Sequence, residues 1–293
     1  MERAPIERVL CPVDFSEFSI NVYKYALSVT QHYGAKLFAQ HVVELWKHPS
    51  ACFAAEAKQY NQFCERFQSS ERERLRLFVQ EHTPRDLQPE CVTQEGTATD
   101  CILSLAQRES VNLIVIGTHG ARGFDRLTLG SVTEAVLRKA RCSVLAVHGQ
   151  HPAQAMEHDV VDLQEVIFCT DFSDDSNRAL DYALSVAAEY KANLTLVHVL
   201  DGLSRLRCEE RKAKAYECLG RLIPEQMRRS QNITTMVRVG SASKEISQLA
   251  CDKHADLAIM AVHGRNGLDS AMFGSTTYRV VQLGHCPVLA VHP

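Results

Sequence analysis

Two copies of one sequence pattern lie end to end in this chain. Four pairs of segments match in the same order: RVLCPVDFS (8–16) with EVIFCTDFS (165–173), YALSV (25–29) with YALSV (182–186), EGTATDCI (95–102) with VGSASKEI (239–246), and CSVLAVH (142–148) with CPVLAVH (286–292). Colinear matches of this kind indicate a tandem duplication, so one architecture must serve both halves. The spacing between copies shortens along the chain, which predicts an insertion of 13 residues in the first copy, between about 48 and 90.

The duplication predicts two domains and a linker. The segment 149–159, GQHPAQAMEHD, is polar, contains Pro152 and has no periodicity, as is typical of a linker. We therefore expect one domain over 1–150, a linker over 151–162 and a second domain over 163–293. At 293 residues the chain has the length of two ordinary domains.

Apolar runs of strand length alternate with helical patterns in each copy. In the first copy the predicted strands are 9–13, 36–43, 91–94, 113–117 and 143–148, and the predicted helices are 19–33, roughly 54–81, 98–109 and 131–138. The runs LIVIG and SVLAV are apolar without alternation, as expected for parallel strands covered on both faces. The pattern predicts an α/β fold with two tandem open parallel sheets.

Composition excludes several classes of protein. The net charge of −3 argues against a general nucleic-acid binder. No apolar run reaches the roughly 18 residues of a membrane span, and the N-terminus has no apolar core of a signal peptide. The eleven cysteines are scattered, and several, such as Cys11, Cys142 and Cys286, lie in apolar runs. We expect a cytoplasmic protein with reduced thiols, no membrane partner and no metal site built from protein side chains alone.

Unusual residues gather where the predicted strands end, which is where open α/β sheets bind ligands. The segment GTHGARGFDRLTLGSVTEAVL, residues 117–137, leads from a strand through a glycine-rich loop to a helix near Ser131. A helix N-terminus favours anions, and Arg122 and Arg126 add positive charge to the loop. The chain contains no Gly-Lys-Ser/Thr, which excludes a Walker A loop, and the first spacing G-x-x-G excludes G-x-G-x-x-G.

The spacing G-x-x-G, nine residues, then G-S resembles the nucleotide-binding signature of the universal stress protein family. A first strand ending in Asp, as in CPVDFSEFS, and a last strand of the form C-P-V-L-x-V also resemble that family. The resemblance implies two Rossmann-like five-stranded sheets in strand order 3-2-1-4-5. It also implies binding of ATP, with Mg²⁺, in members that keep the full loop.

The resemblance assigns residues of the first copy to parts of the nucleotide. Together with Arg122 from the loop, they form the first candidate site: Pro12, Val13 and Asp14 at the adenosine, Val42 at the adenine, Gly117 at the ribose, and His119, Gly120, Gly130, Ser131 and Val132 at the phosphates, with Thr133 nearby.

The second copy departs from this pattern at Ala261, which stands where the first has Gly117. It also has Ser270 in place of Arg126. The second candidate site consists of Asp171, Val199, His263, Gly264, Gly274, Ser275 and Thr276. We expect the first domain to be the better ATP site, and the second to bind weakly, bind another ligand or serve as a structural partner.

Structural interpretations of the same residues stay open. Ser131 and Glu134 fit the S-x-x-E capping box, so Ser131 could cap a helix. Asp14 and Asp171 could be helix N-caps, with Ser16 and Ser173 sharing that role. His41 and His198 lie within predicted strands, where a histidine is more often structural than a ligand.

The sequence favours a nucleotide-binding sensor or regulator. No nucleophile with an adjacent base and no loop lysine is visible, so any ATP hydrolysis is expected to be slow. The alternatives are a stress adaptor that binds no nucleotide and a slow ATPase. The closing strands, 143–148 and 287–292, resemble those through which family members pair. We therefore expect intramolecular pairing of the two domains, with a homodimer as a further expectation.

Overall fold

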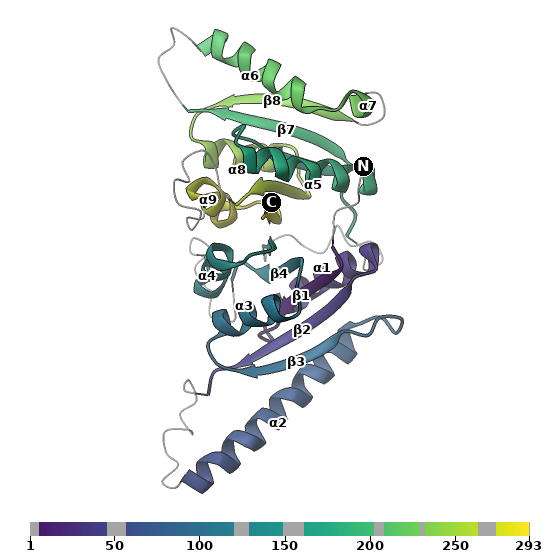
Figure 1. Cartoon of the computed structure of the whole chain (residues 1–293), viewed down its shortest axis with the longest axis vertical. Helices are drawn as coiled ribbons and strands as arrows, with labels where there is room; N and C mark the ends of the chain where they lie inside the picture. Colours follow the sequence, from purple (N-terminus) through teal and green to yellow (C-terminus); the bar gives the residue numbers. More distant parts are fainter. Residues whose placement is uncertain are drawn as a thin grey trace.

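The computed structural model describes residues 6–45, 57–119, 129–148, 161–201, 208–228, 232–262 and 274–292. Figure 1 shows the two copies stacked along the long axis of the molecule. The first copy contains β1 (Arg8–Pro12), α1 (Glu17–Tyr33), β2 (Lys36–Val43), α2 (Ala57–His82), β3 (Glu90–Glu95), α3 (Ala98–Arg108), β4 (Leu113–Gly117), α4 (Ser131–Lys139) and β5 (Ser143–Val147). Two of its predicted strands, 36–43 and 113–117, have the observed bounds, and the other three differ by one residue at one or both ends.

The second copy repeats this order. It contains β6 (Glu165–Cys169), α5 (Asp174–Tyr190), β7 (Asn193–Leu200), α6 (Cys208–Leu222), α7 (Glu225–Arg228), β8 (Ile233–Val239), α8 (Ala242–Asp252), β9 (Leu257–Ala261), α9 (Ser275–Leu283) and β10 (Val288–Val291). The α/β class and the tandem arrangement are confirmed.

The strands form one ten-stranded sheet in the order β3-β2-β1-β4-β5-β10-β9-β6-β7-β8. Within each copy the neighbours are parallel and follow the predicted order 3-2-1-4-5. The two five-stranded sheets are continuous because β10 pairs antiparallel with β5, with Leu289 opposite Leu145. The sheet therefore continues from one copy into the other.

Helices cover both faces of this sheet and bury two core layers. One layer holds side chains from α1, α2, α5 and α6, among them Val22 and Leu75. The other holds side chains from α3, α4, α8 and α9, among them Ile102 and Val136. Alternate residues of a strand enter opposite layers, as Val9 and Leu10 do. This two-sided burial explains why the central strands have uninterrupted apolar sequences.

The insertion predicted in the first copy lies before and within α2. Helix α2 has 26 residues, whereas α6 at the matching place has 15. Pro224 follows α6 and separates it from the short α7, since proline lacks the amide hydrogen that a helix interior needs. The first copy has Gln80 there, and α2 continues to His82. Figure 1 shows α2 extending across the outer end of the molecule, next to β3.

The last residues of the predicted linker pack against the first copy. Val161 and Leu163 are buried, and the Val161 amide donates a hydrogen bond to Ser28 Oγ in α1 at 2.6 Å. Residues 151–160, the rest of the predicted linker, lie outside the described residues, as do residues 149–150 before it.

Side chains from the two copies meet beside the β5–β10 pair. The hydroxyl of Tyr278 in α9 donates to Glu134 of α4 at 3.4 Å, and the Arg138 guanidinium lies over the Tyr278 ring. On the opposite face His32 of α1 lies 3.3 Å from the Glu189 carboxylate of α5. The His32 ring also stacks on Tyr190, with 4.2 Å between ring centroids.

Several cysteines serve as small core residues, as their apolar surroundings predict. Cys11 and Cys286 are buried. Burial raises the pKa of the Cys286 thiol to about 12 and raises the pKa of Cys11 as well. Both thiols therefore stay protonated and unreactive near neutral pH. Among the helices of the described ranges, none combines the length and apolar character needed to cross a membrane.

The contact between His148 and Gly284 gives a test of the arrangement between copies. A Cβ on Gly284 would overlap the His148 ring, with 2.7 Å to Cε1. We expect Gly284→Val to cost about 1–3 kcal/mol, because the ring must move out of its packed position. Thermal unfolding of the full chain should show a lower midpoint.

Gly220 provides the matched control for this substitution. It lies in α6, and a Cβ there would meet nothing within 4 Å. Gly220→Ala should be neutral or stabilise the protein by up to about 1 kcal/mol, since alanine favours helix. An unchanged midpoint for Gly284→Val would contradict the close packing of His148 on the second copy.

Candidate functional site

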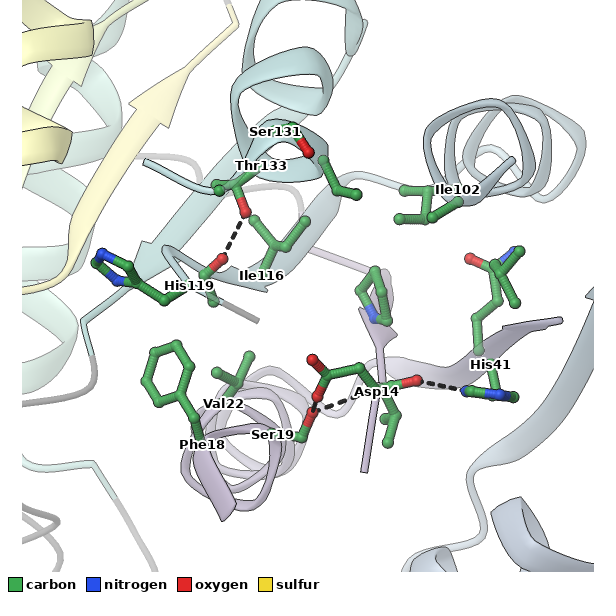
Figure 2. Close-up of a pocket in the computed structure, with 18 of the residues that line it drawn as sticks. Asp14, Phe18, Ser19, Val22, His41, Ile102, Ile116, His119, Ser131 and Thr133 are labelled. Carbon is green, nitrogen blue, oxygen red and sulfur yellow. Dashed lines mark hydrogen bonds between the residues drawn. The ribbon is translucent and has the colours of Figure 1, made fainter. Parts of the chain in front are cut away.

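A cavity of about 520 Å³ opens in the first copy at the carboxyl ends of β1, β2 and β4. The N-terminus of α4 and the first turns of α1 and α3 complete its wall. Figure 2 shows side chains from α1, β2, α3, β4 and α4 around it. Its lining is Pro12, Val13, Asp14, Phe18, Ser19, Val22, Gln40, His41, Val42, Glu44, Ala98, Ile102, Ile116, Gly117, His119, Leu129, Gly130, Ser131, Val132 and Thr133.

The structure brings together ten of the twelve residues predicted for the first site: Pro12, Val13, Asp14, Val42, Gly117, His119, Gly130, Ser131, Val132 and Thr133. Gly120 and Arg122 lie outside the described residues, as do His263 and Gly264 of the second site. The roles of these residues toward a nucleotide stay predictions.

The Asp14 carboxylate fixes the turn between β1 and α1. Its Oδ1 accepts hydrogen bonds from the Ser16 amide at 3.0 Å, from Ser16 Oγ at 2.6 Å and from Ser19 Oγ. The Asp14 amide in turn donates to Ser19 Oγ at 3.0 Å. Figure 2 shows Asp14 and Ser19 side by side at the cavity. Ser16, rather than Asp14, is the N-cap of α1, so the interpretation of Asp14 as that cap is wrong.

The same turn recurs in the second copy with different partners. Ser173 is the N-cap of α5, so Asp171 is not the cap either. Asp171 Oδ1 accepts from the Ser173 amide at 3.0 Å. The Ser176 hydroxyl, however, bonds to Thr170 Oγ1, at 2.9 Å. Thr170 stands where the first copy has Val13, and Ser176 stands where it has Ser19. The Ser176 hydroxyl therefore bonds to a threonine, whereas the Ser19 hydroxyl bonds to Asp14.

His41 is a structural residue of the cavity wall. A carbonyl oxygen can only accept, so His41 Nδ1 donates to Val13 O, at 2.8 Å. The other ring nitrogen lies 3.2 Å from the Glu71 carboxylate of α2. His198 repeats the first bond, with Nδ1 2.8 Å from Thr170 O. Both histidines lie in strands, β2 and β7, as predicted.

Gly117 lies against the first turn of α1. A Cβ at Gly117 would be 2.6 Å from Phe18 Cε1 and 3.1 Å from Val22 Cγ2. The glycine therefore leaves room for the Phe18 ring, which sequence reasoning missed as part of the site. In Figure 2 the Phe18 and Val22 side chains project from α1 beside the cavity.

The second copy accommodates a larger residue at this position. Ala261 replaces Gly117, and at the places of Phe18 and Val22 stand Asp175 and Ala179. Asp175 lacks the aromatic ring of Phe18, and Ala179 lacks the two methyl groups of Val22. These smaller side chains compensate for the added Cβ of Ala261. Ala261 is thus matched to its surroundings, and the wall that Phe18 forms in the first cavity is absent.

Helix α4 begins with a glycine that leaves its first amides uncapped. Gly130 is the N-cap and makes no side-chain cap hydrogen bond, and Ser131 is the first helical residue. The interpretation of Ser131 as a capping residue is therefore wrong. Thr133 Oγ1 donates to the Gly117 carbonyl at 2.5 Å and ties the helix to the end of β4. The N-terminus of α4 thus lines the cavity, with no side-chain cap from Gly130 on its first amides and with the exposed residue Ser131.

His119 lies at the same end of the cavity. Thr118 Oγ1 is 3.0 Å from His119 Nδ1, while Nε2 is buried without a hydrogen-bond partner among the described residues. In the part of the chain that the structure describes, no three His, Cys, Asp or Glu side chains gather as a metal site.

Comparison with known proteins agrees with this architecture. The model of the universal stress protein family matches residues 5–148 and 163–292. A universal stress protein of Methanocaldococcus jannaschii is 28% identical over 141 residues, which cover 48% of this chain and 81% of that protein. Universal stress protein A homolog 1 of Coxiella burnetii is 33% identical over 142 residues, or 48% of this chain and 95% of that protein.

Solved structures match over both copies. The crystal structure of a universal stress protein from Archaeoglobus fulgidus covers 98% of each chain, with a TM-score of 0.61 and 21% identity. That of a putative universal stress protein from Pseudomonas aeruginosa covers 98% of this chain and 94% of its own, with a TM-score of 0.67 and 15% identity. At these identities the likeness shows the fold.

The contact between Gly117 and Phe18 predicts an energetic coupling. Gly117→Ala should destabilise the chain by about 1–3 kcal/mol, because the new methyl group overlaps the ring. In a Phe18→Ala background the same substitution should cost much less. The free energies of unfolding of the two single variants and the double variant would measure this coupling.

Gly130→Ala serves as the control. The nearest atoms to a Cβ there are Thr118 O at 3.2 Å and Thr133 Oγ1 at 3.7 Å, so its effect should not depend on Phe18. Additive effects of Gly117→Ala and Phe18→Ala would show that the ring is not what requires a glycine at 117.

Proposed function

The chain belongs to the universal stress protein family, and we propose that its first copy binds ATP in the cavity at the carboxyl end of the sheet. The observation that carries this proposal is the division of one cavity into an apolar end and an end of unpaired backbone amides. Its volume of about 520 Å³ lies within the range of small-ligand sites.

The apolar end suits the adenosine. Val13, Val42 and Ile102 supply flat apolar contact for a base. Asp14 lies at the rim with its carboxylate held by Ser16 and Ser19, so it presents a fixed acceptor beside the sugar. A polar group held in this way needs no reorganisation when a ligand arrives.

The opposite end suits the phosphates. The first residues of α4 line the cavity, the N-cap Gly130 makes no side-chain cap bond, and the helix dipole adds partial positive charge. Ser131 is exposed there and offers a hydroxyl donor. The unpaired Nε2 of His119 is a further polar atom at this end.

Mg²⁺ would enter with the triphosphate. The described residues hold no preformed metal cluster, so the phosphate oxygens would supply the metal's main ligands. Bound Mg²⁺ neutralises phosphate charge. The chain's own part is to hold the nucleotide, since Asp14, His41 and Thr133 already bond to neighbouring protein groups. This favours a sensor or regulator over an enzyme. The cytoplasm is the compartment that we propose for it.

The second copy has a different role in this proposal. Ala261, Asp175 and Thr170 reshape the place that corresponds to the first cavity. We infer weak nucleotide binding or none there, and an internal pairing of the two copies through β5 and β10. A homodimer would use surfaces outside this pair.

Calorimetric titration of ATP with Mg²⁺ into the full chain tests the proposal. We expect one main binding event. Ser131→Ala should weaken it about tenfold, the typical effect of losing one hydrogen bond to a charged group. Gly130→Val should weaken it further, because a branched side chain would cover the amides of α4. Ser131 is exposed, so its substitution leaves the fold intact.

Ser275→Ala and Gly274→Val are the matched controls in the second copy, and they should leave the main event unchanged. If ATP binding is lost only in these two control variants, the second copy contains the binding site. If the intact chain binds no ATP, the remaining interpretation is a stress adaptor that binds no nucleotide. Conversion of bound ATP to ADP in the same sample would indicate a slow ATPase.

A further inference from the structure

Gln40 is a fully buried amide in the wall of the cavity. It lies on β2 with 0% of its surface exposed, and it lines the cavity together with Val42 and Ile102. Because side chains alternate along a strand, Gln40 shares the α3 side of the sheet with Phe38, which belongs to the apolar layer there. A buried amide in such a place needs partners for both its nitrogen and its oxygen.

The orientation of this amide follows from its neighbours. Gln40 Nε2 donates to the Cys101 carbonyl of α3 at 3.0 Å and to Gln94 Oε1 of β3 at 2.6 Å. A backbone carbonyl can only accept, so the nitrogen must lie on this side. Both amide hydrogens are then used, and the oxygen is the atom left over.

Gln40 Oε1 is buried and has no hydrogen-bond partner among the described residues. A buried acceptor without a donor is costly, typically by tenfold or more in an equilibrium constant. The cost is removed if a ligand in the cavity brings a donor. The structure thus holds an acceptor, fixed in direction by Cys101, beside the apolar end of the proposed nucleotide site.

We propose that Gln40 determines base specificity: its Oε1 accepts a hydrogen bond from the exocyclic amino group of the purine. Adenine carries an amino group at position 6, whereas hypoxanthine and guanine carry a carbonyl oxygen there. That oxygen would face Oε1 as a second acceptor, and neither could donate. This inference rests on nucleotide binding by the first copy and assigns its preference for a 6-amino purine.

The second copy lacks this feature. Val197 stands at the position of Gln40 and is buried in the same layer of the core. A valine there needs no donor, so the corresponding place in the second copy has no means of selecting an amino group. The difference parallels the other changes in that copy, at Thr170, Asp175 and Ala261.

Comparison of ATP with inosine triphosphate tests the group in question, because the two differ only along one edge of the base. Adenine has an amino group at position 6 and an acceptor at N1, whereas hypoxanthine has a carbonyl at position 6 and a hydrogen on N1. Calorimetric titration of each into the intact chain should give an affinity for ATP at least about tenfold higher. In Gln40→Met, which keeps the volume and removes the acceptor, the ratio of the two affinities should fall close to one. Affinity for inosine triphosphate should not fall.

Gln94→Met is the matched control. Like Gln40→Met, it removes the hydrogen bond between the Gln40 and Gln94 side chains. Unlike Gln40→Met, it leaves Gln40 bonded to the Cys101 carbonyl. It should keep the preference for ATP, and thermal unfolding of both variants checks that they fold.

A Gln40→Met chain that keeps the wild-type ratio would overturn the inference while leaving ATP binding in place. An equal loss of preference in Gln94→Met would also overturn it, since the pair would then be only structural. An intact chain that binds neither nucleotide would overturn the proposed function itself.

Discussion

The antiparallel pairing of β5 with β10 is the interaction on which the architecture depends. Each copy by itself would expose the edge of its last strand, with a row of unpaired amides and carbonyls. Pairing these two edges joins ten strands into one sheet and makes both core layers continuous. It also brings corresponding positions of the two copies face to face, because the pair relates them by an approximate two-fold axis.

Facing positions have diverged into complementary pairs. His32 and Glu189 correspond in the duplication and lie 3.3 Å apart, and Glu134 corresponds to Tyr278, which donates to it. If the first copy paired with another first copy, two Glu134 carboxylates would face each other across this surface. Like charges at such positions disfavour that pairing. The complementary contacts between the two halves therefore support the proposed internal pair.

Sequence alone predicted what depends on periodicity and repetition. The apolar runs marked the strands to within one residue in the first copy, because central parallel strands are buried on both faces. The spacing of glycines after β4 led to residues that line one cavity. The contacts of Phe18 and Gln40 could not be predicted, since each joins elements far apart in the chain: Phe18 meets β4, and Gln40 bonds to α3 and β3.

Local patterns also misled where tertiary contacts compete with them. The S-x-x-E sequence at Ser131 matches a capping box, yet the N-cap lies one residue earlier, at Gly130, and Ser131 is the first helical residue. Thr133 bonds to the end of β4 instead, and Glu134 pairs with Arg138 and Tyr278. Of the two residues that a capping box would use, Glu134 is thus engaged by Arg138 of the same helix and by Tyr278 of the second copy.

The hydrogen-bond partners of the polar side chains around the cavity bear on whether the first copy would only bind ATP or also hydrolyse it. Asp14 holds the turn before α1, and His41 holds the end of β1 while facing Glu71. A general base must be within reach of the proton it removes and able to accept it. These groups are instead oriented by the protein itself, whereas Gln40 Oε1 and the amides of α4 are left for a ligand. Groups of this second kind can bind a ligand but do not transfer protons, so the arrangement of the described cavity favours the proposed binding of ATP over its hydrolysis.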